Sequence, residues 1–257
     1  MVKFKIYRFE KGKNSNPRFE NFTIKEGEGM TILDALFKIK DEIDGTLSFR
    51  YSCRGAVCGS CGMLINGSPM LACRTQVGDL IKGKLNFELM IHGPFAFPSI
   101  NKIDSMEIQI EPLPNFAIIK DLVVDMKSFF NGYESIDPWF IKKNKFNNEN
   151  KMSQKEMKAI EPYINCIMCG ICFSKCPSAK RDNKYLGPAT LAKAWRFLAD
   201  SRFENKKEML KKVDSHRGVW ACDTVYRCVD FCPKNVPSTQ GITAIRRKLL
   251  LNKLIRW

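Results

Sequence analysis

The first 110 residues carry the hydrophobic pattern of a small mixed sheet crossed by a helix. Apolar and polar side chains alternate with a period of two in three segments, which predicts half-buried strands. These segments are residues 2–6, 22–24 and 106–110, and a further strand over 63–65 runs into an Asn-Gly turn at 66–67. Residues 31–42 place their apolar side chains on one face of a helix, which Thr31 can cap.

The second half of the chain has helical hydrophobic spacing. The predicted helices are residues 121–130, 188–200, 204–213 and 238–254. Prolines at 112 and 114 mark a hinge before them, and the charged segment 144–151 is predicted to be a surface loop. Residues 246–257 are basic and amphipathic, so they fit either a membrane surface or the packing of a terminal helix on its own domain.

All eleven cysteines fall into three groups. The first group reads C-x4-C-x2-C-x11-C, the plant-type spacing for a 2Fe-2S cluster. Its ligands would be Cys53, Cys58, Cys61 and Cys73, with Gly55, Gly59 and Gly62 in the loop. We expect these glycines to let the backbone wrap tightly and direct N–H groups at sulfur. A zinc site on Cys58 and Cys61 is the alternative, although zinc usually takes two such pairs.

The second group reads C-x2-C-x2-C-x3-C-P, the bacterial ferredoxin run whose fourth cysteine binds the other cluster of a two-cluster domain. The third group occupies the same frame but has Val225 at the second cysteine position. The crossover assigns one 4Fe-4S cluster to Cys166, Cys169, Cys172 and Cys232, and the other cluster to Cys176, Cys222 and Cys228.

Val225 decides the type of the third cluster. Valine cannot coordinate iron, which favours a 3Fe-4S cluster; a 4Fe-4S cluster with a water or serine ligand at the fourth iron is the alternative. Disulfides compete weakly, because the cysteine count is odd and the N-terminus lacks the apolar core of a signal peptide. His92 and His216 lie outside the cysteine loops and are expected to be ordinary surface or loop residues.

The patterns together predict an α+β fold of two domains. Residues 1–114 would form a plant-type ferredoxin (β-grasp) domain, and residues 115–257 an all-helical, bacterial-ferredoxin-like domain. The net charge of +15 comes from Lys and Arg residues spread along the chain without a nucleic-acid motif, so we expect no nucleic-acid partner. An acidic protein or an anionic lipid surface fits better. No apolar stretch is long enough for a transmembrane segment.

The chain resembles the iron–sulfur subunit of succinate dehydrogenase and quinol:fumarate reductase over nearly its whole length. The motifs that carry the resemblance are S-C-R-G-A-V-C-G-S-C-G at 52–62, L-A-C-R at 71–74, the Cys-Pro run at 166–177, G-P-A at 187–189, D-S-R at 200–202 and C-P-K at 232–234. The resemblance implies an electron relay between the FAD of a flavoprotein subunit and quinone at a membrane anchor subunit. It also implies a chain without catalytic residues, bound peripherally to the cytoplasmic face of the inner (cell) membrane.

The resemblance further implies a quinone site. Its residues would be Pro177, Ser178 and Arg246. The chain departs from the family here, since Arg181 stands where many members have tryptophan and Asp223 where some have histidine. Residues 89–105 look like an insertion that either contacts a partner or covers its own domain.

Two other functions fit the same cysteines. One is the same three-cluster relay serving another flavoprotein with a soluble or thiol donor. The other is a free soluble ferredoxin, which the length and the basic balance argue against.

Overall fold

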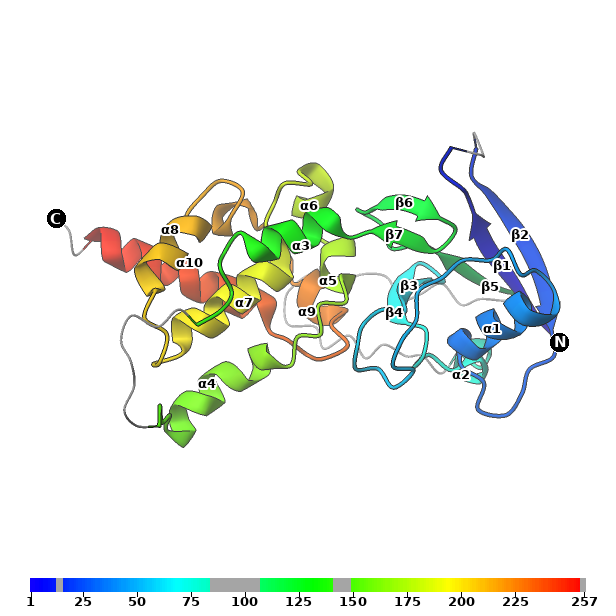
Figure 1. Ribbon diagram of the computed structural model, residues 1–257, viewed down its shortest axis with the longest axis horizontal. Coiled ribbons are helices and arrows are strands. Elements are labelled where there is room, and N and C mark those ends of the chain that lie inside the picture. Colours follow the sequence, from blue (N-terminus) through cyan, green and yellow to red (C-terminus); the bar gives the residue numbers. More distant parts are fainter. Residues whose placement is uncertain (13–15, 84–106, 141–148, 255–257) are drawn as a thin grey trace. The chain divides into compact units, whose positions relative to one another are not determined.

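The computed structural model describes residues 1–12, 16–83, 107–140 and 149–254 (Figure 1). The chain divides into two compact units. Unit 1 comprises residues 1–126 and 167–175, and unit 2 comprises residues 127–166 and 176–257. The predicted insertion at 89–105 and most of the predicted loop at 144–151 lie outside the described residues.

Unit 1 is built on a five-stranded mixed sheet with the order β2-β1-β5-β3-β4. Its strands are β1 (Val2–Arg8), β2 (Arg18–Ile24), β3 (Gly62–Ile65), β4 (Ser68–Leu71) and β5 (Glu107–Glu111). β1 pairs antiparallel with β2 and parallel with β5, while β3 pairs antiparallel with β4 and β5. The alternating residues Val2, Phe4 and Ile6 are buried, as their period of two predicts. The four predicted strands are confirmed.

A helix lies against this sheet, as Figure 1 shows for α1 (Ile32–Glu42). Thr31 caps the helix, because its side chain accepts a hydrogen bond from the Asp34 N–H and the Asp34 carboxylate accepts one from the Thr31 N–H. The apolar face of α1 is buried, including Ile32, Leu36 and Ile39. The predicted helix and its cap are confirmed. A shorter helix, α2 (Val77–Ile81), follows the last cysteine of the first group.

The prediction of a helix over 121–130 was wrong in its first half. Residues 117–125 form a two-stranded antiparallel sheet of β6 (Ala117–Lys120) and β7 (Val123–Asp125), and helix α3 (Lys127–Glu134) begins later. Asp121 has a left-handed φ of 46°, so it makes a tight turn that no helix can contain. The predicted second domain over 115–257 is therefore helical only after this small sheet.

Tertiary hydrogen bonds attach the small sheet to unit 1, beyond the predicted boundary at residue 114. The Asp121 N–H donates to the Phe9 carbonyl at 2.7 Å, and the Leu122 N–H donates to the Ser48 carbonyl at 3.2 Å. Residues 167–175 also belong to unit 1, since the Asn115 side-chain amide donates to the Phe173 and Ser174 carbonyls, both at 3.0 Å. These contacts join segments far apart in the sequence, which local patterns do not reveal.

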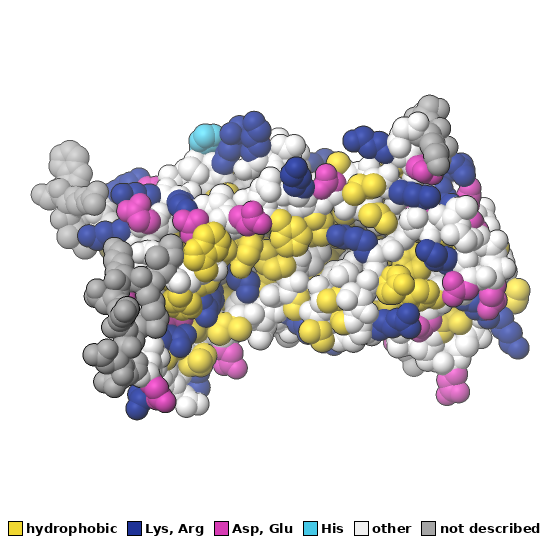
Figure 2. Space-filling view, viewed as in Figure 1, with side chains coloured by type: hydrophobic (Ala, Val, Ile, Leu, Met, Phe, Trp, Pro, Cys, Tyr) yellow, Lys and Arg dark blue, Asp and Glu magenta, His cyan; other side chains and the backbone are white. Residues whose placement is uncertain are grey.

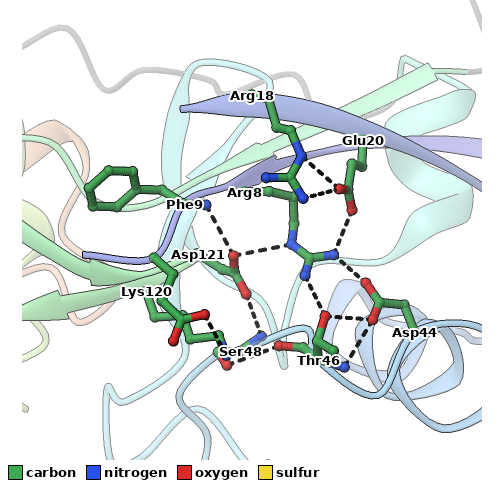
Figure 3. Close-up of polar contacts among 10 residues, drawn as sticks. Arg8, Phe9, Arg18, Glu20, Asp44, Thr46, Ser48, Lys120 and Asp121 are labelled. Atoms are coloured by element: carbon green, nitrogen blue, oxygen red, sulfur yellow. Dashed lines mark hydrogen bonds and ion pairs between the residues drawn. The ribbon is translucent and has the colours of Figure 1, made fainter. Parts of the chain in front are cut away.

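The buried side chain of Arg8 is at the centre of the hydrogen bonds that join the small sheet to the rest of unit 1 (Figure 3). The Arg8 side chain is 6% exposed; its Nε donates to Asp121 Oδ1 at 3.1 Å, and its terminal nitrogens reach Glu20, Asp44 and Thr46. Asp121 in turn accepts hydrogen bonds from the Phe9 and Ser48 N–H groups, so this buried carboxylate is fully surrounded by donors.

Unit 2 is a set of helices around α7 (Gly187–Ala199), which packs against α3, α4, α8 and α10. The other helices of this unit are α4 (Gln154–Ile164), α6 (Pro177–Arg181), α8 (Lys206–Val213), the 3₁₀ turn η1 (Val219–Ala221), α9 (Arg227–Asp230) and α10 (Ser238–Leu254). A further short helix, α5 (Ile171–Ser174), belongs to unit 1. The predicted helices over 188–200, 204–213 and 238–254 are confirmed, whereas α4 was not predicted.

The last helix packs on unit 2 and then leaves apolar side chains exposed. Ile242, Ile245 and Leu249 of α10 are buried, whereas Leu250 and Leu254 are 51% and 71% exposed. Figure 2 shows Lys and Arg side chains spread over the visible face among acidic and apolar ones. Among the described residues, no helix is both long enough and apolar enough to cross a membrane.

Candidate iron–sulfur cluster sites

The first cysteine group lies on a loop of unit 1 whose backbone N–H groups point at sulfur. Cys53 Sγ accepts from the N–H groups of Gly55 at 3.4 Å and of Val57 and Cys58 at 3.3 Å. Cys58 Sγ accepts from the N–H groups of Cys53 and Ser60, both at 3.5 Å. Such donors stabilise a thiolate more than a thiol, and the thiolate is the form that binds metal.

The loop reaches this shape through left-handed backbone at Arg54, Ala56 and Gly59, with φ of 55°, 57° and 74°. Of the three glycines expected to shape this loop, only Gly59 adopts positive φ, while the Gly55 N–H points at Cys53 Sγ as expected. A cation–π contact helps to hold Arg54 in place, since its guanidinium lies 4.6 Å from the centre of the Phe37 ring.

Gly59 is required by close packing as well as by φ. A Cβ at Gly59 would lie 2.6 Å from the Cβ and 2.8 Å from the Cα of Cys169, which also belongs to unit 1. No side chain can be accommodated at such distances from backbone. The first cysteine loop and the segment that carries Cys169 are thus in direct contact within unit 1.

The remaining two cysteines of the first group are close to each other. Burial raises the pKa of the Cys61 thiol to about 12, and the backbone N–H of Cys73, which donates a hydrogen bond to it, opposes that rise. At Cys58 burial also raises the pKa, but hydrogen bonds from Ser60 and Cys53 outweigh it and lower the pKa to about 6. Iron must displace the proton from each thiol, so binding at Cys61 would be the more strongly linked to proton release. Four thiols, two of which accept several directed N–H hydrogen bonds, fit a 2Fe-2S cluster.

The cysteines of the third predicted ligand set, Cys176, Cys222 and Cys228, line a small, partly open cavity in unit 2. Cys176 precedes α6, Cys222 follows η1, and Cys228 lies in α9. Val225, Pro177, Pro188 and Thr239 are among the other residues of the wall. The structure therefore brings together the three cysteines of the predicted 3Fe-4S site, with an aliphatic side chain in place of a fourth thiol.

Hydrogen bonds support this cavity from two sides. The Thr224 N–H donates to Cys222 Sγ at 3.4 Å, and Thr239 Oγ1 lies 3.1 Å from Cys228 Sγ. Burial raises the pKa of Cys228 to about 12, and the hydrogen bond with Thr239 opposes that rise. Thr239 could donate to this sulfur when metal is bound. Thr239 was not singled out from the sequence, because it lies eleven residues beyond Cys228 and reaches it only through the start of α10.

The predicted second set is divided between the units. Cys166 and Cys232 belong to unit 2, where both pack against the buried side chains of Tyr163, Ala192 and Val236. The Val236 N–H donates to Cys232 Sγ at 3.3 Å. Cys169 and Cys172 belong to unit 1, and the joint ligation of one 4Fe-4S cluster stays a prediction from the spacing.

Pro177, Ser178 and Arg246, the residues expected near quinone, all belong to unit 2 but make different contacts. Pro177 and Ser178 line the cavity. Arg246 donates to the Val219 carbonyl at 2.9 Å and the Cys222 carbonyl at 2.6 Å, so it holds the segment that carries Cys222. Contact of these three residues with a quinone stays a prediction.

The two departures from the family pattern contact each other. Arg181 donates from both terminal nitrogens to the Asp223 carboxylate at 2.9 Å, and Ser178 Oγ donates to the same carboxylate at 3.1 Å. These donors, first of all Arg181, lower the pKa of Asp223. No local pattern indicates this pair, because its members are 42 residues apart.

Single-metal sites and histidines are the other groups that could bind metal. Over the part of the chain that the structure describes, no three or more His, Cys, Asp or Glu side chains are arranged to hold a single metal ion. His216 is exposed, as expected for an ordinary surface residue, while His92 lies outside the described residues.

Comparison with known proteins gives two family matches and a likeness in fold. Residues 3–131 match the 2Fe-2S iron–sulfur cluster binding domain, and residues 163–236 match the 4Fe-4S dicluster domain. A chain of the Mycobacterium smegmatis Sdh1 complex in the apo form has the same fold, with a TM-score of 0.79 at 20% identity over 98% of this chain and 97% of that one. A hypothetical protein from Helicobacter pylori aligns with a TM-score of 0.53 at 19% identity, and there the match covers 96% of this chain but only 39% of the other.

Proposed function

Since this chain belongs to the family of 2Fe-2S iron–sulfur cluster binding domains, we propose that it is the electron-transfer subunit of a succinate:quinone oxidoreductase, either a succinate dehydrogenase or a fumarate reductase. It would relay electrons between the FAD of a flavoprotein subunit and quinone at a membrane anchor. We place it peripherally on the cytoplasmic face of the inner membrane, attached through that anchor.

One observation carries the proposal. Three cysteine groups account for every cysteine in the chain, and Cys176, Cys222 and Cys228 line one pocket with Val225 where a fourth thiol would stand. Three clusters of different type in one chain suit a relay, because cluster type is one of the main determinants of reduction potential. The fold that this chain shares, over 98% of its length, with a chain of the Mycobacterium smegmatis Sdh1 complex supports a place in a complex of that kind.

The cysteines would hold the clusters in three sets. These are Cys53, Cys58, Cys61 and Cys73 for 2Fe-2S, Cys166, Cys169, Cys172 and Cys232 for 4Fe-4S, and Cys176, Cys222 and Cys228 for 3Fe-4S. When bound, the clusters supply one-electron transfer, and the chain makes no bond to the carbon of the substrate. Unit 1 would be of the β-grasp type, and the helical part of the bacterial ferredoxin type.

The protein's own contribution is to set the spacing and potential of these sites. Three N–H groups at Cys53 Sγ and two at Cys58 Sγ offset negative charge on the first site, which favours its reduced state. At the third site Val225 would exclude a fourth iron. Pro177, Ser178 and Arg246 would position the quinone beside it.

Purification of the native complex from membranes tests the proposal. We expect an FAD-containing chain and one or more anchor chains to co-purify, and the complex to oxidise succinate or reduce fumarate with a defined quinone. A single brown chain that elutes as a soluble monomer would indicate a free ferredoxin instead. A flavoprotein partner that uses neither succinate nor fumarate would show that the relay serves another oxidoreductase.

A further inference from the structure

One carboxylate, that of Asp223, is part of the wall of the cavity that Cys176, Cys222 and Cys228 line. Asp223 directly follows Cys222 in the chain. Among the described residues of this wall, Arg227 is the other one with a charged side chain, and it lies on the Cys228 side, in α9. A fixed charge in the wall acts on any charge that the three cysteines hold, because the Coulomb energy falls only with the inverse of distance.

Three hydrogen bonds hold the Asp223 carboxylate in place. The two terminal nitrogens of Arg181 donate to its two oxygens, each at 2.9 Å, and Ser178 Oγ donates to Oδ2 at 3.1 Å. Both donors belong to α6, whose first residue directly follows Cys176. A bidentate arginine fixes the direction of a carboxylate as well as its distance. The carboxylate is thus fixed between the segments that carry Cys176 and Cys222.

The two charges of this ion pair differ in their exposure to water. The Arg181 side chain is 63% exposed, whereas that of Asp223 is 33% exposed. The cavity wall, as far as the structure describes it, includes Asp223 and does not include Arg181. Water and salt screen an exposed charge more than a partly buried one. The two opposite charges therefore do not cancel at the cavity, and the negative one dominates there.

We propose that the Arg181–Asp223 pair sets the reduction potential of the cluster held by Cys176, Cys222 and Cys228. The Asp223 carboxylate lowers this potential, and the Arg181 guanidinium offsets part of the effect while it orients the carboxylate. The inference rests on the proposed function, since it needs the cluster to be present.

The sign of the effect follows from charge. Uptake of one electron makes the cluster more negative, so a negative charge close by destabilises the reduced state more than the oxidised state. A positive charge does the opposite. Arg181 acts on the cluster mainly through Asp223 and is thus a positioning residue.

Redox titration of the intact complex, followed by EPR of the oxidised 3Fe-4S cluster, tests the proposal. In Asp223→Asn, which keeps the size of the side chain, we expect the reduced-to-oxidised ratio at a fixed potential to rise on the order of tenfold, equivalent to about 59 mV for a one-electron couple. In Arg181→Gln the ratio should fall, by only about threefold because this charge is the better screened one. Opposite signs identify a charge effect, since both substitutions remove the same ion pair and a purely structural role would make them act alike.

Two further variants serve as controls. Arg181→Lys keeps the positive charge and should leave the potential close to that of the wild type. Asp182→Asn makes the same change of charge one residue away from Arg181. Asp182 pairs with Arg217 at 2.9 Å, with side chains 41% and 46% exposed, and it is not part of the described cavity wall. It should therefore change the ratio by less than about twofold.

The outcomes separate this proposal from the proposed function. Shifts of the same sign in Asp223→Asn and Arg181→Gln, no shift in either, or an equal shift in Asp182→Asn would overturn the proposal while the proposed function stands. If Asp223→Asn loses its cluster, Arg181→Gln decides alone, and a ratio that rises or stays constant overturns the proposal. Absence of any 3Fe-4S signal in the wild-type complex would instead overturn the cluster assignment itself.

Discussion

At the scale of single residues, Val225 stands where the bacterial ferredoxin frame has a cysteine. Its side chain is part of the wall of the cavity lined by Cys176, Cys222 and Cys228. A thiol introduced at this position would be the fourth ligand that the frame expects. The identity of one side chain would thus determine whether three or four irons are held.

Val225→Cys should therefore convert the 3Fe-4S cluster to 4Fe-4S and lower its reduction potential. The measurement is low-temperature EPR of the oxidised complex, in which the 3Fe-4S signal should disappear. Val225→Ala is the control, because alanine cannot coordinate iron and should keep the signal. A 3Fe-4S signal that persists in a correctly folded Val225→Cys complex would count against the assignment.

Gly59 is a second position at which a change of one side chain, here the addition of a Cβ atom, should affect a cluster site. In Gly59→Ala the new methyl group meets the Cys169 backbone at 2.8 Å, and the residue must also keep a φ of 74°. We expect loss of most of the 2Fe-2S absorbance, or destabilisation by about 3 kcal/mol, since strain of this kind adds to a steric clash.

Gly55→Ala provides the comparison for Gly59→Ala within the same loop. A Cβ at Gly55 would be 3.7 Å from its nearest neighbour, which is ordinary contact, and its φ is not positive. This variant should retain the 2Fe-2S spectrum. Equal loss of the cluster in both variants would mean that general loop stiffness matters, and that contact with Cys169 does not.

At the scale of elements, the hydrogen bonds of Arg8 connect β1 to several other parts of unit 1. Its guanidinium reaches Glu20 on β2, Asp44 after α1 and Asp121 in the turn between β6 and β7 (Figure 3). Partial burial raises the pKa of Asp44, but hydrogen bonds from Thr46 and Arg8 outweigh it and hold the pKa at about 2.

Arg8→Met should destabilise unit 1 by about 3 kcal/mol, because it leaves the buried Asp121 carboxylate without its cation. Urea unfolding followed by far-UV circular dichroism measures the change. The folded pKa of Asp44 lies below its ordinary 3.8, so the stability it contributes is complete above about pH 4 and is lost as the pH falls through about 2. The difference between Arg8→Met and wild type should accordingly be the same at pH 6 and pH 8.

Arg18→Met is the matched control for Arg8→Met. Arg18 also pairs with Glu20, at 2.6 Å, but its side chain is 52% exposed. Exposed ion pairs contribute about 0–1 kcal/mol, so this variant should unfold close to wild type. Equal destabilisation by the two substitutions would show that the buried tie to Asp121 is not what stabilises unit 1.

At the scale of the whole molecule, the three cysteine sets imply a definite iron content. A fully loaded chain should contain about nine irons, from clusters with two, four and three. Elemental analysis of the native complex, normalised to the amount of this chain, measures the ratio. A value near two would leave only the first set as a cluster site and would remove the relay.

How far the sequence predicts this molecule can be judged from particular segments. The strands over 2–6, 22–24, 63–65 and 106–110 and the capped helix after Thr31 follow from local periodicity and capping, and they are confirmed. The segment 117–125 was missed; its two strands pair with each other, and hydrogen bonds to Phe9 and Ser48, which are distant in sequence, hold the turn between them. The glycine positions also do not mark every special backbone residue of the cysteine loop, because the non-glycine residues Arg54 and Ala56 adopt the left-handed conformation there.

The sequence by itself determined the grouping of the cysteines, since ligand spacing within a loop is a local property that a short stretch of chain can encode. Tertiary structure decided what surrounds them: the approach of Gly59 to Cys169, and the cavity wall that includes Val225. Those features arise from contacts between segments tens to more than a hundred residues apart. Their positions depend on how the elements pack, and no local pattern in the sequence records that packing.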